Sequence, residues 1–419
     1  MKRELERGLD RRGLVAVLVP VLVAAVGALA AWRALRPAWE VPAPTWANRA
    51  EERMQDFRDA LHYPIREFLA GGNPYDPAVM FAHWPVRQNF NLYQPYHLVL
   101  HLPFALPDYR VGAVAFAAFL LLLLVFLAVL TAGHVRAPLF LGTAVVGTLL
   151  VVSQVGKAQL YVGQVNPLIA VGAAGALLAR DRYPRLAVVA LALAWLKPQF
   201  GLPLAVLLFA RGSRKVALGG TGVAALASLL VVVPLVLGGG GVGAFLDVVG
   251  RNLEHAGATA YGAVDSLTAQ RVDVAAVLFR ITGWLPPGAE PLVLVGVLAA
   301  TVLVVRRLDR AGDPTGLAVA DLVTCLAVVV AVVHQPGDVL IAVPALAMVA
   351  VRWWRDRTPS LGVALVAALI PFAHLHFVDD AVRSSLGERA SVTLDGAAIV
   401  VAWVVLVVVA RRHAPAVRT

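Results

Sequence analysis

The chain has 419 residues, of which 59% are hydrophobic and only 15% charged, and its mean hydropathy is +0.76. A soluble protein of this length would need far more surface charge, so the composition excludes that class. The net charge of +10 would suit a nucleic-acid partner, but the basic residues form short clusters between apolar runs. That distribution indicates membrane topology and not nucleic-acid binding. The single cysteine, Cys325, excludes an intramolecular disulfide.

The first predicted element is an apolar run at 14–31. It is longer than the ~7–15 apolar residues of a signal peptide, so we interpret it as an uncleaved span. Further runs long enough for membrane helices follow, among them 111–131, 291–305 and 397–410. We expect an all-α polytopic membrane protein, a single integral membrane domain over 1–419 with about twelve transmembrane helices.

Basic clusters at both ends of the chain and between many of the runs, such as 180–185 and 211–215, mark the cytoplasmic side. Both termini are then cytoplasmic in a multi-pass protein of the plasma membrane. Two large polar regions, 33–110 and 238–290, lie on the extracytoplasmic face. A region as long as 33–110 is not needed merely to connect two helices, so we expect the active site there.

Asp56 lies in the polar stretch 53–59, soon after the first span, and we expect it on a short helix along the membrane surface. A carboxylate beside an apolar wall can act as a general base, because desolvation raises its proton affinity. The alternative is an ordinary interfacial acid paired with Arg53 or Arg58. Spacing alone favours this alternative.

A glycine- and proline-rich turn at 71–77 would fold the chain back over the membrane and present Tyr75 and Asp76. Aromatic and amide side chains follow it, including Trp84, Asn91 and Tyr93. Such a mixture suits sugar binding, and it suits an aromatic belt at the membrane interface equally well.

Gln164 and Asn166 stand at the start of an apolar helix. Both side chains would be costly in lipid, so we expect them to face the protein interior. They can hydrogen-bond neighbouring helices there, and the start of a helix also favours an anion.

The segment 186–210 lies between two basic clusters, yet it is too short for two full crossings of ~20 residues each. Pro198 breaks it near the middle. We therefore predict two short helices in a hairpin whose tip, Lys197-Pro198-Gln199, lines a cavity. A lysine in so apolar a segment is functional by default, and phosphate is its natural partner.

His334 and Asp338 lie in an outer turn between two apolar runs, where they can bind or protonate a leaving phosphate. For Asp338 alone, a helix cap is the better interpretation. His374, His376 and the acids at 379–380 could suggest a metal site, but the ligand set is incomplete and we interpret them as an interfacial polar cap. We expect no metal and no cofactor.

Taken in chain order, these motifs resemble glycosyltransferase family 87, within the GT-C class of membrane glycosyltransferases. The resemblance covers about positions 50–350 and rests on Asp56-Phe57, Gly71 to Pro77, Gly163-Gln164-Val165-Asn166, Lys197-Pro198-Gln199, and His334 with Asp338. The family comprises polyprenyl-phosphate-mannose-dependent α-mannosyltransferases of actinobacteria.

The resemblance implies a hexosyltransferase that moves a sugar from a polyprenyl-phosphate donor to a cell-envelope glycolipid or glycan. Mannose is the expected sugar, and arabinose is the alternative. The product would be an inverted, α-linked sugar, and no nucleotide or metal is required. Asp56 would act as the base, and Lys197 and His334 would stabilise the departing phosphate. Further candidates for substrate binding are Tyr75, Asp76, Gln164, Asn166, Gln199 and Asp338.

The alternative function is a transporter or flippase of a lipid-linked glycan. It would explain the spans and Lys197, but it predicts inverted repeats and polar residues midway along several helices, and the sequence has neither. A third possibility is a non-catalytic subunit of an envelope-assembly machine. The retained polar motifs argue against it.

Overall fold

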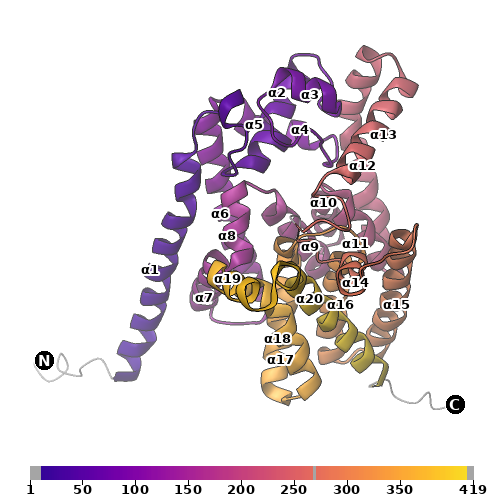
Figure 1. Ribbon diagram of the computed structural model, residues 1–419. Helices are drawn as coiled ribbons and strands as arrows, with labels where there is room; N and C mark the ends of the chain where they lie inside the picture. Colours follow the sequence, from indigo (N-terminus) through magenta and orange to yellow (C-terminus); the bar gives the residue numbers. More distant parts are fainter. Residues whose placement is uncertain (1–10, 268–269, 413–419) are drawn as a thin grey trace, which may run out of the picture.

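The structure, a computed structural model, describes residues 11–267 and 270–412, and every regular element in these ranges is helical (Figure 1). The predicted all-α membrane architecture is confirmed. At one edge stands α1 (Arg11–Glu40), which contacts α6 (Tyr109–His134), α7 (Leu139–Val152) and α8 (Gln154–Val162). The apolar stretch of α1 buries none of its residues inside the protein, as expected of a helix surrounded by lipid.

Residues 41–108, which we name the cap region, form short helices at the upper end of the molecule in Figure 1. The sequence placed the start of this region at 33, but α1 continues to Glu40. Arg36 and Glu40 form an exposed i,i+4 ion pair that supports the extra turns. The helices of the cap region are η1 (Trp46–Asn48), η2 (Phe57–His62), α2 (Tyr63–Leu69), α3 (Pro77–His83), α4 (His97–Leu100) and α5 (Leu102–Ala105).

The hairpin predicted around Lys197 is present. Its arms are α10 (Pro184–Ala194) and α11 (Pro198–Ala210), preceded by α9 (Asn166–Ala179) and followed by α12 (Arg214–Gly238). Arg180, just before the first arm, and Arg211, just after the second, both bond the carboxylate of Asp321, at 3.0 and 2.7 Å. The two ends of the hairpin therefore lie at the same level of the bundle, and Lys197 lies at its opposite tip.

The second half of the chain completes the bundle around a buried helix, α16 (Pro314–Ala331), of which 78% of the residues are buried inside the protein. The first residues of α1 and the end of α20 lie at the same lower end in Figure 1, away from the cap region. The remaining helices are α13 (Val242–Ala258), α14 (Val274–Thr282), α15 (Ala289–Ala311), η3 (Pro336–Ala342), α17 (Val343–Asp356), α18 (Pro359–Ala373), α19 (His376–Leu386) and α20 (Glu388–Arg412).

Seven helical segments in the described part of the chain are long and apolar enough to cross a membrane. Two bent pairs, α7 with α8 at 67° and α18 with α19 at 103°, raise the number to nine if each pair is one span. The shorter apolar helices α9, α10 and α11 complete the expected total of about twelve helical segments. The break between α7 and α8, the hairpin tip at Lys197 and the last turn of α18 all border the same cavity.

Candidate active site

One cavity of about 310 Å³ collects most of the predicted site residues. Its walls come from the cap region, α8, the turn before α9, the hairpin tip, the 333–338 turn, α18 and α20. Segments far apart in the chain therefore converge on a single space. Six of the candidates line it, namely Asp56, Gln164, Lys197, Gln199, His334 and Asp338.

Asp56 reaches the cavity because the cap region is held against the end of α8. The backbone N–H of Met54 donates to the carbonyl of Tyr161 over 2.7 Å. Gly163 ends α8 with φ +71°, and a Cβ there would lie 2.9 Å from the Cβ of Phe57. Only glycine allows this approach without strain. A π-helical turn, Phe57–His62, follows Asp56 directly, a distortion that often marks functional sites.

The carboxylate of Asp56 is not paired with the neighbouring arginines, so the interpretation as an ordinary interfacial ion pair is wrong. Arg53 pairs with Glu51 at 2.7 Å, and Arg58 pairs with Asp59 at 2.6 Å. Burial raises the pKa of Asp56 to about 6, and the charge of Lys197 and a hydrogen bond from Gln164 oppose this rise. A carboxylate with such a pKa is ionised near neutral pH and is still a competent proton acceptor.

Lys197 directly precedes α11 and lines the cavity instead of reaching for the membrane surface. Its Nζ donates to Oδ1 of Asn166 over 2.8 Å and lies 5.3 Å from the centre of the Tyr93 ring. The amide of Asn166 in turn donates to Oδ1 of Asp338 over 2.6 Å and to Gln164. Asn166 thus lies behind the cavity wall and fixes the positions of Lys197 and Asp338.

His334 is buried, and its ring lies edge-on to Phe200 with 4.5 Å between ring centres. Its Nδ1 is 3.1 Å from the carbonyl of Val332, so Nδ1 carries the proton of the neutral ring. Burial lowers the pKa of His334, which favours the neutral form of the ring. Its Nε2 has no hydrogen-bond partner among the described residues. Because His334 lines the cavity, this nitrogen is available to bond a ligand there.

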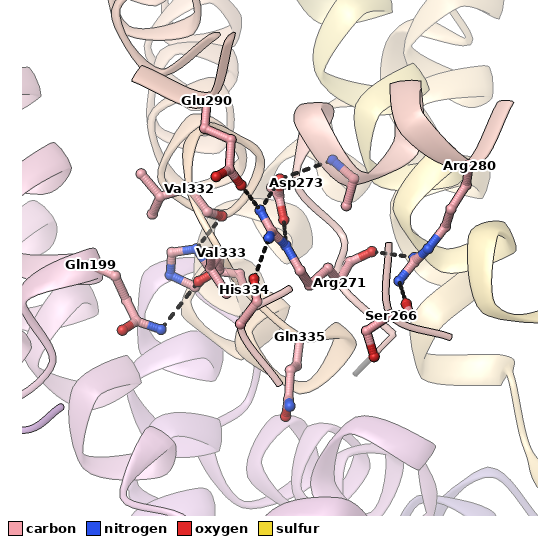
Figure 2. A network of polar contacts seen from close by, with 12 residues as sticks. Gln199, Ser266, Arg271, Asp273, Arg280, Glu290, Val332, Val333, His334 and Gln335 are labelled. Atoms are coloured by element: carbon pink, nitrogen blue, oxygen red, sulfur yellow. Dashed lines mark hydrogen bonds and ion pairs between the residues drawn. The ribbon is translucent and has the colours of Figure 1, made fainter. Parts of the chain in front are cut away.

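Figure 2 shows how the second polar region holds this histidine in place. The backbone N–H of Val272 donates to the carbonyl of His334 over 2.9 Å. Next to it, Arg271 is 1% exposed and forms a two-point ion pair with Asp273 at 2.8 and 2.9 Å, while its third contact reaches Glu290. The same segment contributes Gln270 to the cavity wall.

Tyr75 and Asp76 lie outside this cavity. The hydroxyl of Tyr75 donates to the carbonyl of Tyr93 over 3.2 Å inside the cap region. Asp76 accepts from the N–H groups that begin α3, 2.9 Å away at the closest, and pairs with Arg251 at 3.3 Å. Both side chains hold the predicted turn at 71–77 in shape. Asp338 lines the cavity and also caps η3 by accepting from the N–H of Gln335.

Sequence reasoning named only two members, Gln164 and Gln199, of the largest group of lining residues. The chain contains only nine glutamines, and eight of them line this cavity. Neutral amides that donate and accept hydrogen bonds suit a ligand with many hydroxyl groups. The eight are Gln55, Gln88, Gln154, Gln159, Gln164, Gln199, Gln270 and Gln335.

Gln159 shows how closely the wall is packed. Its Nε2 donates to the carbonyl of Val155 one turn back, and its buried Oε1 has no partner among the described residues. Gly337 lies against it, where a Cβ would approach Nε2 to 2.3 Å. The glycine therefore leaves room for the amide of Gln159.

The fold and the site define a polytopic membrane protein with a polar, polyol-suited cavity that contains one carboxylate of raised pKa and one lysine. The model of glycosyltransferase family 87 matches residues 91–333. The chain belongs to this family and is a membrane glycosyltransferase, as the resemblance implied. No curated protein and no solved structure matches the chain. The matched range contains Gln164, Lys197 and Gln199, while Asp56 precedes it and His334 follows it by one residue.

Proposed function

We propose that the chain transfers a hexose, mannose, from a polyprenyl-phosphate donor to a glycolipid or glycan of the cell envelope. The transfer inverts the anomeric carbon and gives an α-linkage. The observation that carries this proposal is the meeting of Asp56, Lys197 and His334 in one cavity that is otherwise rich in neutral amides.

In the proposed step Asp56 accepts the proton of an acceptor hydroxyl. The freed oxygen forms a bond to the anomeric carbon, while the bond from that carbon to the phosphate oxygen breaks. The electron pair leaves with the polyprenyl phosphate. Lys197 and a proton on Nε2 of His334 stabilise the charge that develops there. The phosphate itself favours protonation of His334, because a nearby anion raises the pKa of a histidine.

The charge of the cavity supports a monophosphate donor. Among the described residues that line it, Lys197 is the sole lysine or arginine, and Asp56, Asp338 and Asp395 are carboxylates. One fixed cation can balance a phosphodiester with a single negative charge. A nucleoside diphosphate carries more charge and needs further cations to bind in such a site.

We further propose that the cavity opens on the extracytoplasmic side of the plasma membrane. The paired residues Arg180 and Arg211 lie at the opposite end of the hairpin from Lys197. Clusters of arginine favour the cytoplasm. The lipid tail of the donor would then enter from the outer leaflet, and both termini would be cytoplasmic.

The test uses purified protein in nanodiscs with polyprenyl-phosphate-mannose and extracted envelope glycolipids, and mass spectrometry detects the product. Asp56→Asn should lower kcat by about 10²–10⁴-fold, since it removes the proton acceptor. The matched control is Asp247→Asn on the exposed face of α13, which should keep the wild-type rate.

Three results would contradict parts of the proposal. Full turnover by Asp56→Asn would exclude Asp56 as the base. Turnover with polyprenyl-phosphate-arabinose but not with polyprenyl-phosphate-mannose would identify arabinose as the transferred sugar. Movement of labelled lipid across liposomes without any covalent product would favour a flippase instead.

A further inference from the structure

The last helix of the bundle places an additional carboxylate in the cavity. Asp395 lies in α20, is 5% exposed, and lines the same space as Asp56 and Lys197. Its position is beyond the range that the family model matches, and the step proposed above does not use it.

His374 holds this carboxylate in one orientation. The histidine lies at the sharp bend between α18 and α19, and its Nδ1 is 2.9 Å from Oδ1 of Asp395. On the other side of the ring, Nε2 is 3.6 Å from Oδ1 of Asp379, which also accepts from the hydroxyl of Ser391. The ring is therefore fixed between two carboxylates, and Oδ2 of Asp395 has no hydrogen-bond partner among the described residues.

Asp395 enters the cavity from a different wall than the proposed reacting groups. It comes from α20 beside His374, whereas Asp56 comes from the cap region and Lys197 from the hairpin tip. A carboxylate repels a phosphate but accepts hydrogen bonds from hydroxyl groups. His374 is turned toward Asp379, so this wall presents a single carboxylate, which is too few ligands for a metal ion.

We infer that Asp395, oriented by His374, binds hydroxyl groups of a sugar at a subsite separate from the phosphate. The hydroxyls donate and the free carboxylate oxygen accepts. Both the transferred sugar and the acceptor carry such hydroxyls, and the experiment distinguishes them. The inference rests on the proposed function, because that function is what brings a sugar into the cavity.

Asp395→Asn keeps the size of the side chain and removes its charge, and Asp380→Asn on the exposed face of α19 is the matched control. A hydrogen bond to a charged group is worth roughly a 10- to 100-fold change in affinity. We expect Asp395→Asn to raise KM for one substrate by about 10-fold or more, with kcat nearly unchanged. A rise for the acceptor assigns the subsite to the acceptor, and a rise for the donor assigns it to the transferred sugar.

His374→Gln should raise the same KM, and it should add little in the Asp395→Asn background, because the two residues act as one unit. A merely structural role would instead lower the unfolding temperature of both variants and leave both KM values at the wild-type level. The inference is overturned if Asp395→Asn leaves both KM values at the wild-type level or lowers kcat alone.

Failure of the proposed function is recognised separately, because wild-type protein would then transfer no sugar from any donor. In that case saturation-transfer NMR with methyl α-mannoside tests the subsite without turnover. Contact with the sugar in the wild type that is lost in Asp395→Asn supports the inference. Equal signals in both proteins, or no signal in the wild type, overturn it.

Discussion

Replacing Lys197 by methionine should both slow the reaction and move its pH dependence. In the wild type Asp56 must be ionised to act as a base, and its pKa is about 6. The rate should therefore fall as the pH drops through about 6 and level off above it. The charge of Lys197 holds this pKa down. Its loss should raise the pKa by roughly one unit or more, as removal of a nearby opposite charge does.

The same substitution removes the fixed cation proposed to stabilise the leaving phosphate. Loss of one such group lowers kcat by about 10²–10³-fold on the pH plateau, or roughly 3–4 kcal/mol of transition-state stabilisation. Lys197→Arg is the control, because it keeps the charge and should keep the acidic limb of the profile where the wild type has it, whatever its effect on kcat.

The assay is the initial rate of product formation from about pH 5 to about pH 9, with saturating donor and acceptor. The two effects are independent readouts, one on the height of the profile and one on its position. An acidic limb of Lys197→Met that stays in place, or that moves to lower pH, would show that Lys197 and Asp56 do not share one electrostatic site.

Two further predictions concern the cap region. His101 is buried and its pKa is lowered to about 4, so protonation favours unfolding: its contribution to stability is complete above pH ~6.5 and falls below it. The thermal stability of His101→Gln relative to wild type should therefore improve by about 1 kcal/mol on going from pH ~7.5 to ~5.5, and a constant difference would contradict this. Gly163→Ala should lower both the unfolding temperature and kcat, because its Cβ would displace Phe57 and with it Asp56. Gly222→Ala, within α12 with open space around it, should do neither, and equal effects of the two substitutions would refute the argument.

The bundle was predictable because its signals are local. Apolar runs set the spans, and the proline after Lys197 set the hairpin. The end of α1 was not predicted, because the charged residues after 32 resemble the start of a loop. In the structure those charges lie on the exposed surface of a continuing helix, so they do not end it.

The site was predictable only in part, for a physical reason. A lysine in an apolar segment stands out because its burial is costly, and Lys197 was singled out in that way. Asp56 and His334 were named from their polar stretch and outer turn, where spacing alone did not distinguish a site from an ordinary surface. Glutamine carries no charge and has no fixed spacing, so the convergence of eight of them from distant segments could be seen only in three dimensions. Tyr75 and Asp76 lie outside the cavity, because their polar groups bond the backbone of the cap region, and a turn uses the same polar groups as a binding site. The catalytic and binding roles stay predictions until the variants are measured.

The contact between Gly337 and Gln159 has a consequence for how relatives of this enzyme could come to differ. A residue larger than glycine at 337 would displace the amide of Gln159, and the flexible side chain of Gln159 could yield without disturbing any helix. The space left for a sugar ring would shrink, while Asp56 and Lys197 would stay where they are. An added methyl group at position 337 would thus favour a smaller sugar over a bulkier one. Substrate preference could change at this position while the reaction stays the same.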